Sequence, residues 1–298
     1  MSDTANREIA TRLDEVAQLL EEQGANPYRV QAYRRAADTV RNLKQPVAEI
    51  VNSQGLAGLD ALPGIGASLA RSVRELVVSG RLPMLERLRG ESDPISLLAS
   101  VPGIGRIVAK RLHDELGLES LEGLEEAAWD GRLATVAGIG IKRLAGIRDS
   151  LATRLGRVRR GAAPQNDDEP SVAELLGVDR EYRVRAARGE LRTIAPRRFN
   201  PTNEAWLPVL HTTRGDRHYT ALFSNTARAH QSGATRDWVV LYFDGGGGEH
   251  QNTIITARYG PLAGRRIVRG REIDCERYYE MTERPMTQPA VAARRTFL

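Results

Sequence analysis

The sequence contains a single cysteine, Cys275, among its 298 residues. A disulfide framework within the chain and a cysteine-cluster zinc site are therefore both excluded. Long hydrophobic runs are also missing, since no uninterrupted apolar stretch approaches the roughly 18 residues that span a bilayer. The first residues, Met1 to Thr4, do not begin a basic and then hydrophobic signal region. These absences predict a cytoplasmic protein that has no membrane partner.

Lysine is scarce as well. Only Lys44, Lys110 and Lys142 are lysines among the 43 basic residues, so arginine carries nearly all of the positive charge. Arginine suits bidentate phosphate contacts, although so wide a bias is equally typical of genomic codon usage. The formal net charge of +5 favours acidic partners without making the chain a polycation.

The chain does have a short pattern that occurs three times: a hydrophobic residue, a small residue, glycine, isoleucine and glycine. The copies are Leu62–Gly66, Val101–Gly105 and Val136–Gly140. Each copy precedes a helix-forming stretch, so each places flexible backbone beside the unpaired amides of a helix N-terminus. Such amides hold an anion without a charged side chain, and we expect that anion to be a nucleic-acid phosphate.

The candidate phosphate-binding residues are the repeated residues and the basic residues just behind them. They are Gly64, Ile65, Gly66, Gly103, Ile104, Gly105, Arg106, Lys110, Gly138, Gly140 and Lys142. The alternative is a tight turn between packed helices, because a positive φ and close helix approach also favour glycine. That alternative is strongest for the third copy, where Ala137 replaces the proline of the other two.

Hydrophobic periodicity predicts helices through the first half of the chain, including one over 5–24 and one that begins sharply at Asn26 and Pro27. A basic and then polar stretch follows Arg157 and predicts a linker. Beyond it, Ser171 and Glu174 predict a capping box at a helix start. Alternating apolar residues then predict strands over 206–211, 217–223, 238–243 and 253–259.

We therefore predict an all-helical module followed by a small mixed α/β domain, whose sheet has about four mostly antiparallel strands. The expected boundaries are 1–90 for a helical domain with the first repeat, 91–158 for the second and third repeats, 159–170 for the linker and 171–298 for the mixed domain.

Two histidines of the mixed domain are candidate metal ligands. A turn centred on Arg214 and Gly215 would place His211 directly opposite His218, with Cβ atoms roughly 5 Å apart. A zinc site needs a third protein ligand, and no spacing fixes one among His230, His250 and Asp216. The alternative is a pair of histidines at the polar end of a hairpin.

The segment Ser224–Thr226 resembles a capped helix start, which would be an anion pocket if nearby arginines converge on it. The arginines considered are Arg197, Arg198, Arg228 and Arg236. Helix capping alone is the alternative explanation.

Residues 5 to about 155 resemble the N-terminal region of family X DNA polymerases. The resemblance lies in Asn26–Ala37 (NPYRVQAYRRAA), in Leu62–Gly66 with Gly80–Leu82, and in Val101–Gly105. It implies a helix-hairpin-helix module that grips DNA without sequence specificity, often at gaps. It also implies that hairpin carbonyls sometimes hold a monovalent cation. The third hairpin has a counterpart in bacterial members, which favours a bacterial source. Residues 171–298 resemble no characterised family.

The resemblance also implies that Arg29 and Tyr33 help to hold the 5′ phosphate at a gap. It places Ser72 where the family has its lyase lysine and Ser68 where it has a phosphate-binding lysine. Because a Schiff base needs an amine, we expect no lyase chemistry at this position. Polymerase chemistry is not expected either, since Asp237 and Asp244 bracket a predicted strand and would lie about 23 Å apart.

The leading interpretation is a non-sequence-specific DNA-binding protein that binds gapped or structured DNA in DNA repair, without catalytic residues. One alternative is a DNA-processing hydrolase or nuclease with a site in 190–280 around His211, His218 and Asp216. The other is an adaptor that is held on DNA and binds a protein partner through 171–298.

Overall fold

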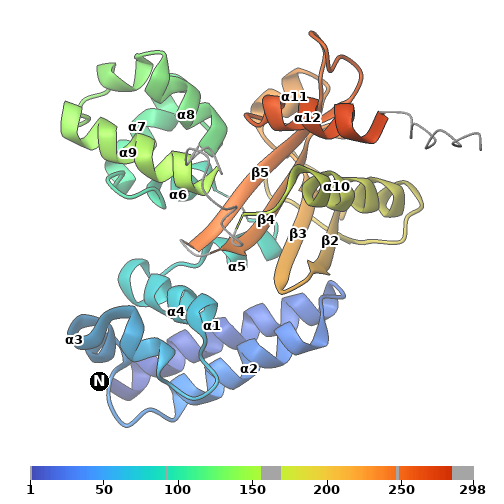
Figure 1. The fold of residues 1–298 in the computed structure, drawn as a ribbon. Helices are drawn as coiled ribbons and strands as arrows, with labels where there is room; N and C mark the ends of the chain where they lie inside the picture. The colour runs from blue at the N-terminus through green and yellow to red at the C-terminus, as the bar shows by residue number, and fades with distance from the viewer. Residues whose placement is uncertain (1, 92, 156–168, 246–247, 284–298) are drawn as a thin grey trace, which may run out of the picture.

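The structure is a computed structural model that describes residues 2–91, 93–155, 169–245 and 248–283. Its buried hydrophobic residues form three clusters, which run from Ile9 to Leu88, from Leu98 to Leu155 and from Val172 to Cys275. The first two clusters belong to helical units and the third belongs to a sheet with its helices (Figure 1). Most of the predicted linker, residues 159–168, lies outside the described residues.

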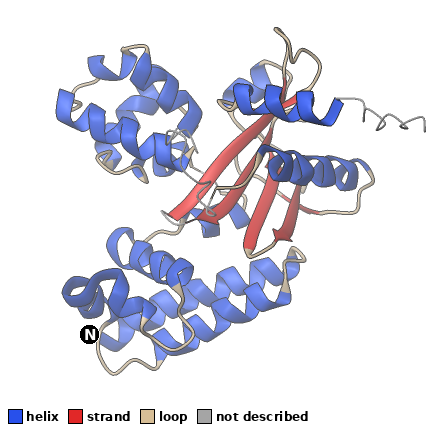
Figure 2. Ribbon diagram, in the orientation of Figure 1, coloured by secondary structure: helices blue, strands red, loops and turns tan. Residues whose placement is uncertain are grey.

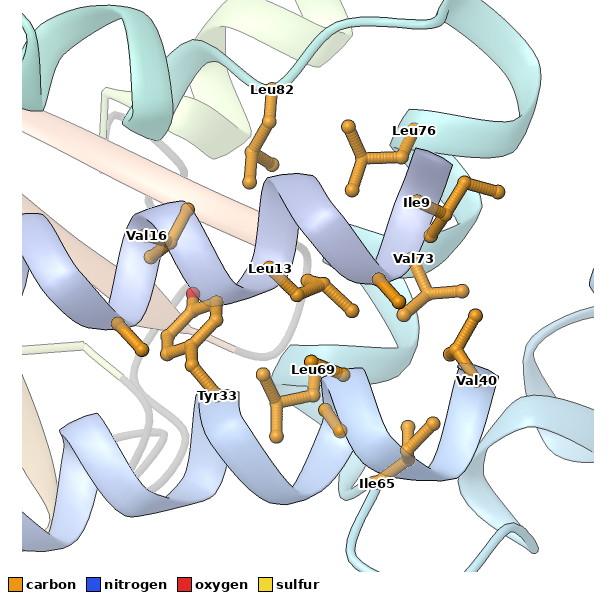
Figure 3. Packing of buried hydrophobic residues seen from close by; sticks show 14 of the residues in the cluster. Ile9, Leu13, Val16, Tyr33, Val40, Ile65, Leu69, Val73, Leu76 and Leu82 are labelled. Atoms are coloured by element: carbon orange, nitrogen blue, oxygen red, sulfur yellow. The ribbon is translucent and has the colours of Figure 1, made fainter. Parts of the chain in front are cut away.

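The first helical unit contains five helices, and Asn26 starts the second of them as predicted, with its side chain accepting a 2.9 Å hydrogen bond from the Tyr28 amide. The core lies between α1, α2 and α4, as Figure 3 shows. A positive φ at Gly55 kinks α3, so its last turn points away from its first. The helices are α1 (Ser2–Glu22), α2 (Pro27–Arg41), α3 (Val47–Asp60), α4 (Ala67–Ser79) and α5 (Pro83–Leu88).

The second helical unit begins at Asp93, whose carboxylate accepts hydrogen bonds from the amides of Ile95 and Ser96, both at 3.2 Å. A serine hydroxyl caps a later helix in the same way, since Ser120 Oγ accepts from Gly123 N at 3.1 Å. The elements are α6 (Pro94–Ala99), α7 (Arg106–Leu116), α8 (Leu121–Trp129), the 3-10 helix η1 (Arg132–Thr135) and α9 (Ile141–Arg154).

The C-terminal domain is an antiparallel sheet in which every strand pairs with its neighbours in sequence (Figure 2). Its strands are β1 (Arg192–Ile194), β2 (Leu207–Arg214), β3 (Arg217–Phe223), β4 (Val239–Gly245), β5 (Gly248–Thr256) and β6 (Arg266–Val268). Its helices are α10 (Val172–Ala187), α11 (Ala227–Gln231) and α12 (Glu272–Glu283). The predicted fold class, a helical region followed by a mixed domain with an antiparallel sheet, is thus confirmed.

The two faces of this sheet differ in chemistry because successive side chains of a strand point to opposite sides. Tyr219, Ala221 and Leu241 lie on the apolar face, in the core that α10 covers. On the other face, polar residues of β4 and β5 contact the two helical units. One face therefore holds the domain together, and the other docks it onto the rest of the chain.

The structure differs from the expected elements at four points. The sheet has six strands because β1 and β6, of three residues each, are too short to show an alternating pattern. Helix α12 lacked a periodic signal, since Cys275 is its one fully buried residue. Ser171 does cap α10, but the Glu174 carboxylate accepts from Tyr219 Oη at 2.7 Å, so only half of the capping box forms. Finally, Arg214 pairs with Arg217, which moves the β2–β3 turn one residue along the chain.

No helix in the described part of the chain is both long enough and apolar enough to cross a membrane.

We expect Arg266 to be critical for the stability of the C-terminal domain. Its guanidinium donates to both carboxylate oxygens of Asp179, at 3.0 and 2.7 Å, and Asp179 is only 2% exposed. Arg266→Met leaves that carboxylate buried and unpaired, so urea denaturation should show that the free energy of unfolding falls by about 3–5 kcal/mol.

Two control variants make this measurement specific. Arg265→Met removes an exposed pair with Glu283 and should cost less than about 1 kcal/mol. Asp179→Leu combined with Arg266→Met removes both buried charges and should recover most of the loss. If the double variant is as unstable as Arg266→Met, an unpaired Asp179 is not the cause.

Candidate nucleic-acid interface

All three glycine hairpins have the same backbone geometry. In each, the isoleucine amide donates to the carbonyl three residues earlier, over 3.1 Å at Ile65, 2.9 Å at Ile104 and 3.2 Å at Ile139. The first glycine has a positive φ of 75° at Gly64, 90° at Gly103 and 98° at Gly138. This is the geometry of a type II turn, in which glycine is favoured at the third position because other residues are strained there.

The isoleucine of each hairpin is an anchor. Ile65, Ile104 and Ile139 are 2%, 3% and 7% exposed and belong to the helical cores, whereas the glycines on both sides of each are exposed. Since the isoleucine amide is also used within the turn, these residues position the hairpin. Ile65 and Ile104 therefore have no free hydrogen-bond donor for the phosphate contacts predicted for them.

The second glycine of each hairpin is the N-cap of the next helix. Gly66, Gly105 and Gly140 have extended backbones, and no side chain caps α4, α7 or α9. Side chains cap α2, α6, α8, α10 and α11, and α3 and α5, which also lack a side-chain cap, have Pro46 and Leu82 at the N-cap instead of glycine. Because the first amides of a helix have no partner within it and carry partial positive charge, these three N-termini are suited to bind an anion.

The second and third hairpins lie side by side. A Cβ atom placed on Gly103 would lie 3.6 Å from Arg143 Cγ, and one on Gly138 would lie 3.7 Å from Arg143 Nη1. Arg111 Nη1 also donates to the Ala137 carbonyl at 2.8 Å. Ala137 thus replaces proline without changing the turn, and the two hairpins form one surface. Arg106, Lys110 and Lys142 are exposed beside it.

The first hairpin is held by α2. Thr39 Oγ1 donates to the Pro63 carbonyl at 2.7 Å, and a Cβ atom on Gly64 would lie 3.4 Å from Arg35 Cβ. Arg35 is exposed and has no ion pair among the described residues. It is a candidate that sequence reasoning missed, because only the three-dimensional approach of α2 to the hairpin brings it to this site.

Arg29 and Tyr33 are brought together but are buried, at 9% and 4% exposed. Tyr33 points from α2 toward α1 (Figure 3), and its hydroxyl lies 3.3 Å from Met84 Sδ. Arg29 Nη2 lies 3.8 Å from Asp244 Oδ2, so β4 covers it. Burial raises the pKa of Tyr33, even though Arg29 beside it acts in the opposite direction. Tyr33 is therefore buried within its own helical unit and Arg29 is covered by the C-terminal domain, so neither is open to a phosphate in this arrangement.

Ion pairs and hydrogen bonds join the polar sheet face to the helical units. Arg87 donates to both carboxylate oxygens of Glu249, and its guanidinium lies 3.7 Å from the centre of the Tyr242 ring. Glu122 accepts from Gln251 and Thr253. Two buried atoms here, Arg87 Nε and Gln251 Oε1, have no hydrogen-bond partner. Contacts of this polar kind are usual for an interface between domains of one chain and differ from those of a hydrophobic core.

The predicted anion pocket near Ser224–Thr226 forms, but a carboxylate of this chain fills it. Glu119 accepts from Arg198 Nη2 at 2.5 Å and from the Ala227 amide at 2.6 Å. Burial acts to raise the pKa of Glu119, but these bonds outweigh it and the pKa is lowered. Of the other arginines considered, Arg228 lies 3.2 Å from Glu126, so it binds the helical unit instead.

The predicted pairing of His211 with His218 is wrong. Because the turn residues are Gly215 and Asp216, His211 lies opposite Thr220 and His218 lies opposite Thr213. The His211 nitrogens lie 3.1 Å from Thr220 Oγ1 and 3.0 Å from Gln23 Oε1, so both have partners. No three metal-ligating side chains cluster within the described ranges.

Comparison with known proteins agrees with this geometry. Residues 4–82 match the family model described as a helix-hairpin-helix domain, and residues 95–153 match the one described as a SAM-like helix-hairpin-helix tandem. The predicted helix-hairpin-helix region, similar to the N-terminal region of family X DNA polymerases, is thereby confirmed. The tandem model spans the paired second and third hairpins.

One curated relative is the DNA polymerase/3'-5' exonuclease PolX of Bacillus subtilis (strain 168). It is 28% identical to this chain over 137 residues, which is 46% of this chain and 23% of the relative. The likeness therefore covers a minor part of the relative's length.

We expect docking of the C-terminal domain to weaken as pH falls. Burial, with Arg29 and Arg87 nearby, lowers the pKa of His211 to about 3. Docking thus favours neutral His211. The contribution of His211 to the free energy of docking is therefore complete above its ordinary pKa of about 6.5 and is lost as pH falls below that value. Hydrogen exchange of the α1 and α2 amides should therefore accelerate between about pH 7 and pH 5, after correction for intrinsic exchange.

His211→Asn removes this titrating group and should make the corrected exchange less dependent on pH. His230→Asn changes a histidine of α11 whose contacts, with Asn225 and two aromatic rings, all lie within its own domain, and it should behave as the unmodified chain does. An unchanged pH dependence in His211→Asn would show that His211 does not control docking.

Proposed function

We propose that this chain is a non-sequence-specific DNA-binding protein that uses its hairpins to hold the phosphates of gapped or structured DNA during DNA repair. The observation that carries the proposal is the repeated turn, which leaves an exposed helix N-terminus without a side-chain cap at α4, α7 and α9. Backbone amides bind phosphate irrespective of base, so the expected binding has no sequence specificity.

The arrangement of the hairpins favours the binding of gapped or bent DNA over the binding of a short, regular duplex. The second and third hairpins form one surface on the second helical unit, and the first hairpin lies on the other unit beside α2. Two surfaces on separate units can hold the sugar-phosphate backbone of DNA at two points, one on each side of a gap or a bend. The polymerase and exonuclease name of the Bacillus relative supports a role in DNA processing.

The residues give no support for lyase chemistry on α4. Ser72 donates its hydroxyl to the Ser68 carbonyl at 3.3 Å, and neither residue supplies the amine that a Schiff base needs. The hydrolase alternative has no geometric support either, because the described residues hold no cluster of three metal ligands.

A monovalent cation fits the second hairpin better than the others. At the third hairpin, Arg111 and Arg143 donate to the carbonyls of Ala137 and Gly138, so a cation there would lie against two guanidinium groups. At the first hairpin, Thr39 donates to the Pro63 carbonyl. We therefore propose that any such cation binds the carbonyls of the second hairpin.

A charge placed at the N-cap tests phosphate binding without disturbing the turn. Gly105 has a φ of −81° and open space around its Cα, so Gly105→Asp fits, and aspartate is a favourable N-cap. Its carboxylate would occupy the amides that phosphate needs and would repel the DNA. We expect affinity for a gapped duplex, measured by fluorescence anisotropy, to fall about tenfold or more without loss of thermal stability.

Asn52→Asp is the charge-matched control. Asn52 is exposed on α3 and belongs to none of the three hairpins. The net charge changes equally in both variants, so Asn52→Asp should change affinity by less than about threefold. Equal affinities for the two variants would contradict phosphate binding by the second hairpin.

A further inference from the structure

A second site of different chemistry lies in the C-terminal domain. A cavity of about 670 Å³ opens between α10, α12 and the apolar face of the sheet, which is within the roughly 300–1,000 Å³ usual for small-molecule sites. Three aromatic rings line it, those of Trp206 on the segment before β2, Phe223 on β3 and Tyr279 on α12. The Tyr279 hydroxyl donates to the Arg266 carbonyl at 2.8 Å, which fixes the position of that ring.

The rim of the cavity is positively charged. Arg180 and Arg183 on α10 and Arg236 before β4 are exposed, and none has an ion pair or hydrogen bond among the described residues. The one carboxylate among the lining residues, that of Asp179, is buried, and both its oxygens accept from Arg266. Nothing that lines the cavity therefore neutralises the three guanidinium groups.

Neighbouring arginines of the same domain are paired. Arg185 and Arg214 bind Glu181, and Arg217 binds Glu174. Carboxylates that bind arginine are thus present on α10, but none of the three rim arginines binds one. An anion with an apolar or aromatic part would match both the rim and the walls.

We propose that this cavity binds a nucleotide, with its base against the aromatic walls and its phosphate on the arginine rim. Guanidinium groups bind phosphate oxygens in a bidentate manner, and aromatic side chains accept any base by stacking. The site does not depend on the hairpins, since none of its residues belongs to the helical units. Its ligand is either a free mononucleotide or an unpaired nucleotide of a DNA strand.

Titration of the full chain separates the parts of this proposal. Deoxyadenosine monophosphate should bind saturably in calorimetry and should change the tryptophan fluorescence, because Trp206 lines the cavity. Deoxyadenosine without phosphate and inorganic phosphate without a base should each bind at least about tenfold more weakly than the nucleotide. Inorganic phosphate binding as tightly as the nucleotide, or an acidic peptide binding more tightly, would overturn the proposal.

Variants locate the binding. Replacing Arg180 and Arg183 together by alanine should weaken nucleotide binding about tenfold or more. Arg192→Ala removes an exposed arginine of β1 that is not part of the lining and should change binding by less than about twofold. Equal binding by the two variants would overturn the assignment to this cavity.

A short single-stranded oligonucleotide distinguishes the two sources. If the ligand is part of a strand, the oligonucleotide should bind more tightly than the mononucleotide, and its binding should survive Gly105→Asp but not the loss of Arg180 and Arg183. If the ligand is free, the mononucleotide should bind at least as tightly. Failure of both ligands to bind at millimolar concentration would overturn the nucleotide site without bearing on the hairpins.

Discussion

A glycine with positive φ determines the direction of the chain in each of the three glycine hairpins between helices. At Gly64, Gly103 and Gly138, the left-handed backbone turns the buried isoleucine into the core and the following helix N-terminus outward. The core thereby fixes the exposed amides in place, so their positions do not depend on long surface side chains. The affinity for phosphate that we propose is thus a property of the helical packing itself.

The second constraint is the division of the C-terminal sheet into an apolar face and a polar face. The polar face covers Arg29 and supplies Glu249 to Arg87, so the helical units and the sheet neutralise part of each other's charge. Glu119 of the second helical unit likewise neutralises positive charge on the C-terminal domain, because it fills an anion pocket there. These contacts are polar throughout. Because they cover Arg29, a ligand can reach that part of α2 only when the domains separate.

Local signals explain which features could be predicted from the sequence. Asn26 with Pro27 starts α2, and the repeated glycines mark the hairpins, because a cap or a turn depends on few adjacent residues. The short strands β1 and β6 and the helix α12 carry no such signal. The docked arrangement also has none, because His211 and Gln23 are 188 residues apart. The burial of Arg29 under β4 could not be predicted for the same reason. A shift of one residue in the β2–β3 turn was enough to misplace His211.

The central claim, that the backbone amides of the hairpins contact phosphate, is tested most directly by nuclear magnetic resonance of the full chain labelled with ¹⁵N-glycine. Addition of a gapped duplex should shift the amide signals of Gly66, Gly105 and Gly140 strongly. The signal of Gly260, which lies between β5 and β6 of the C-terminal domain and belongs to no hairpin, should move little. If the three hairpin signals stay in place while the DNA is bound, the amides do not hold the phosphates and the account is wrong.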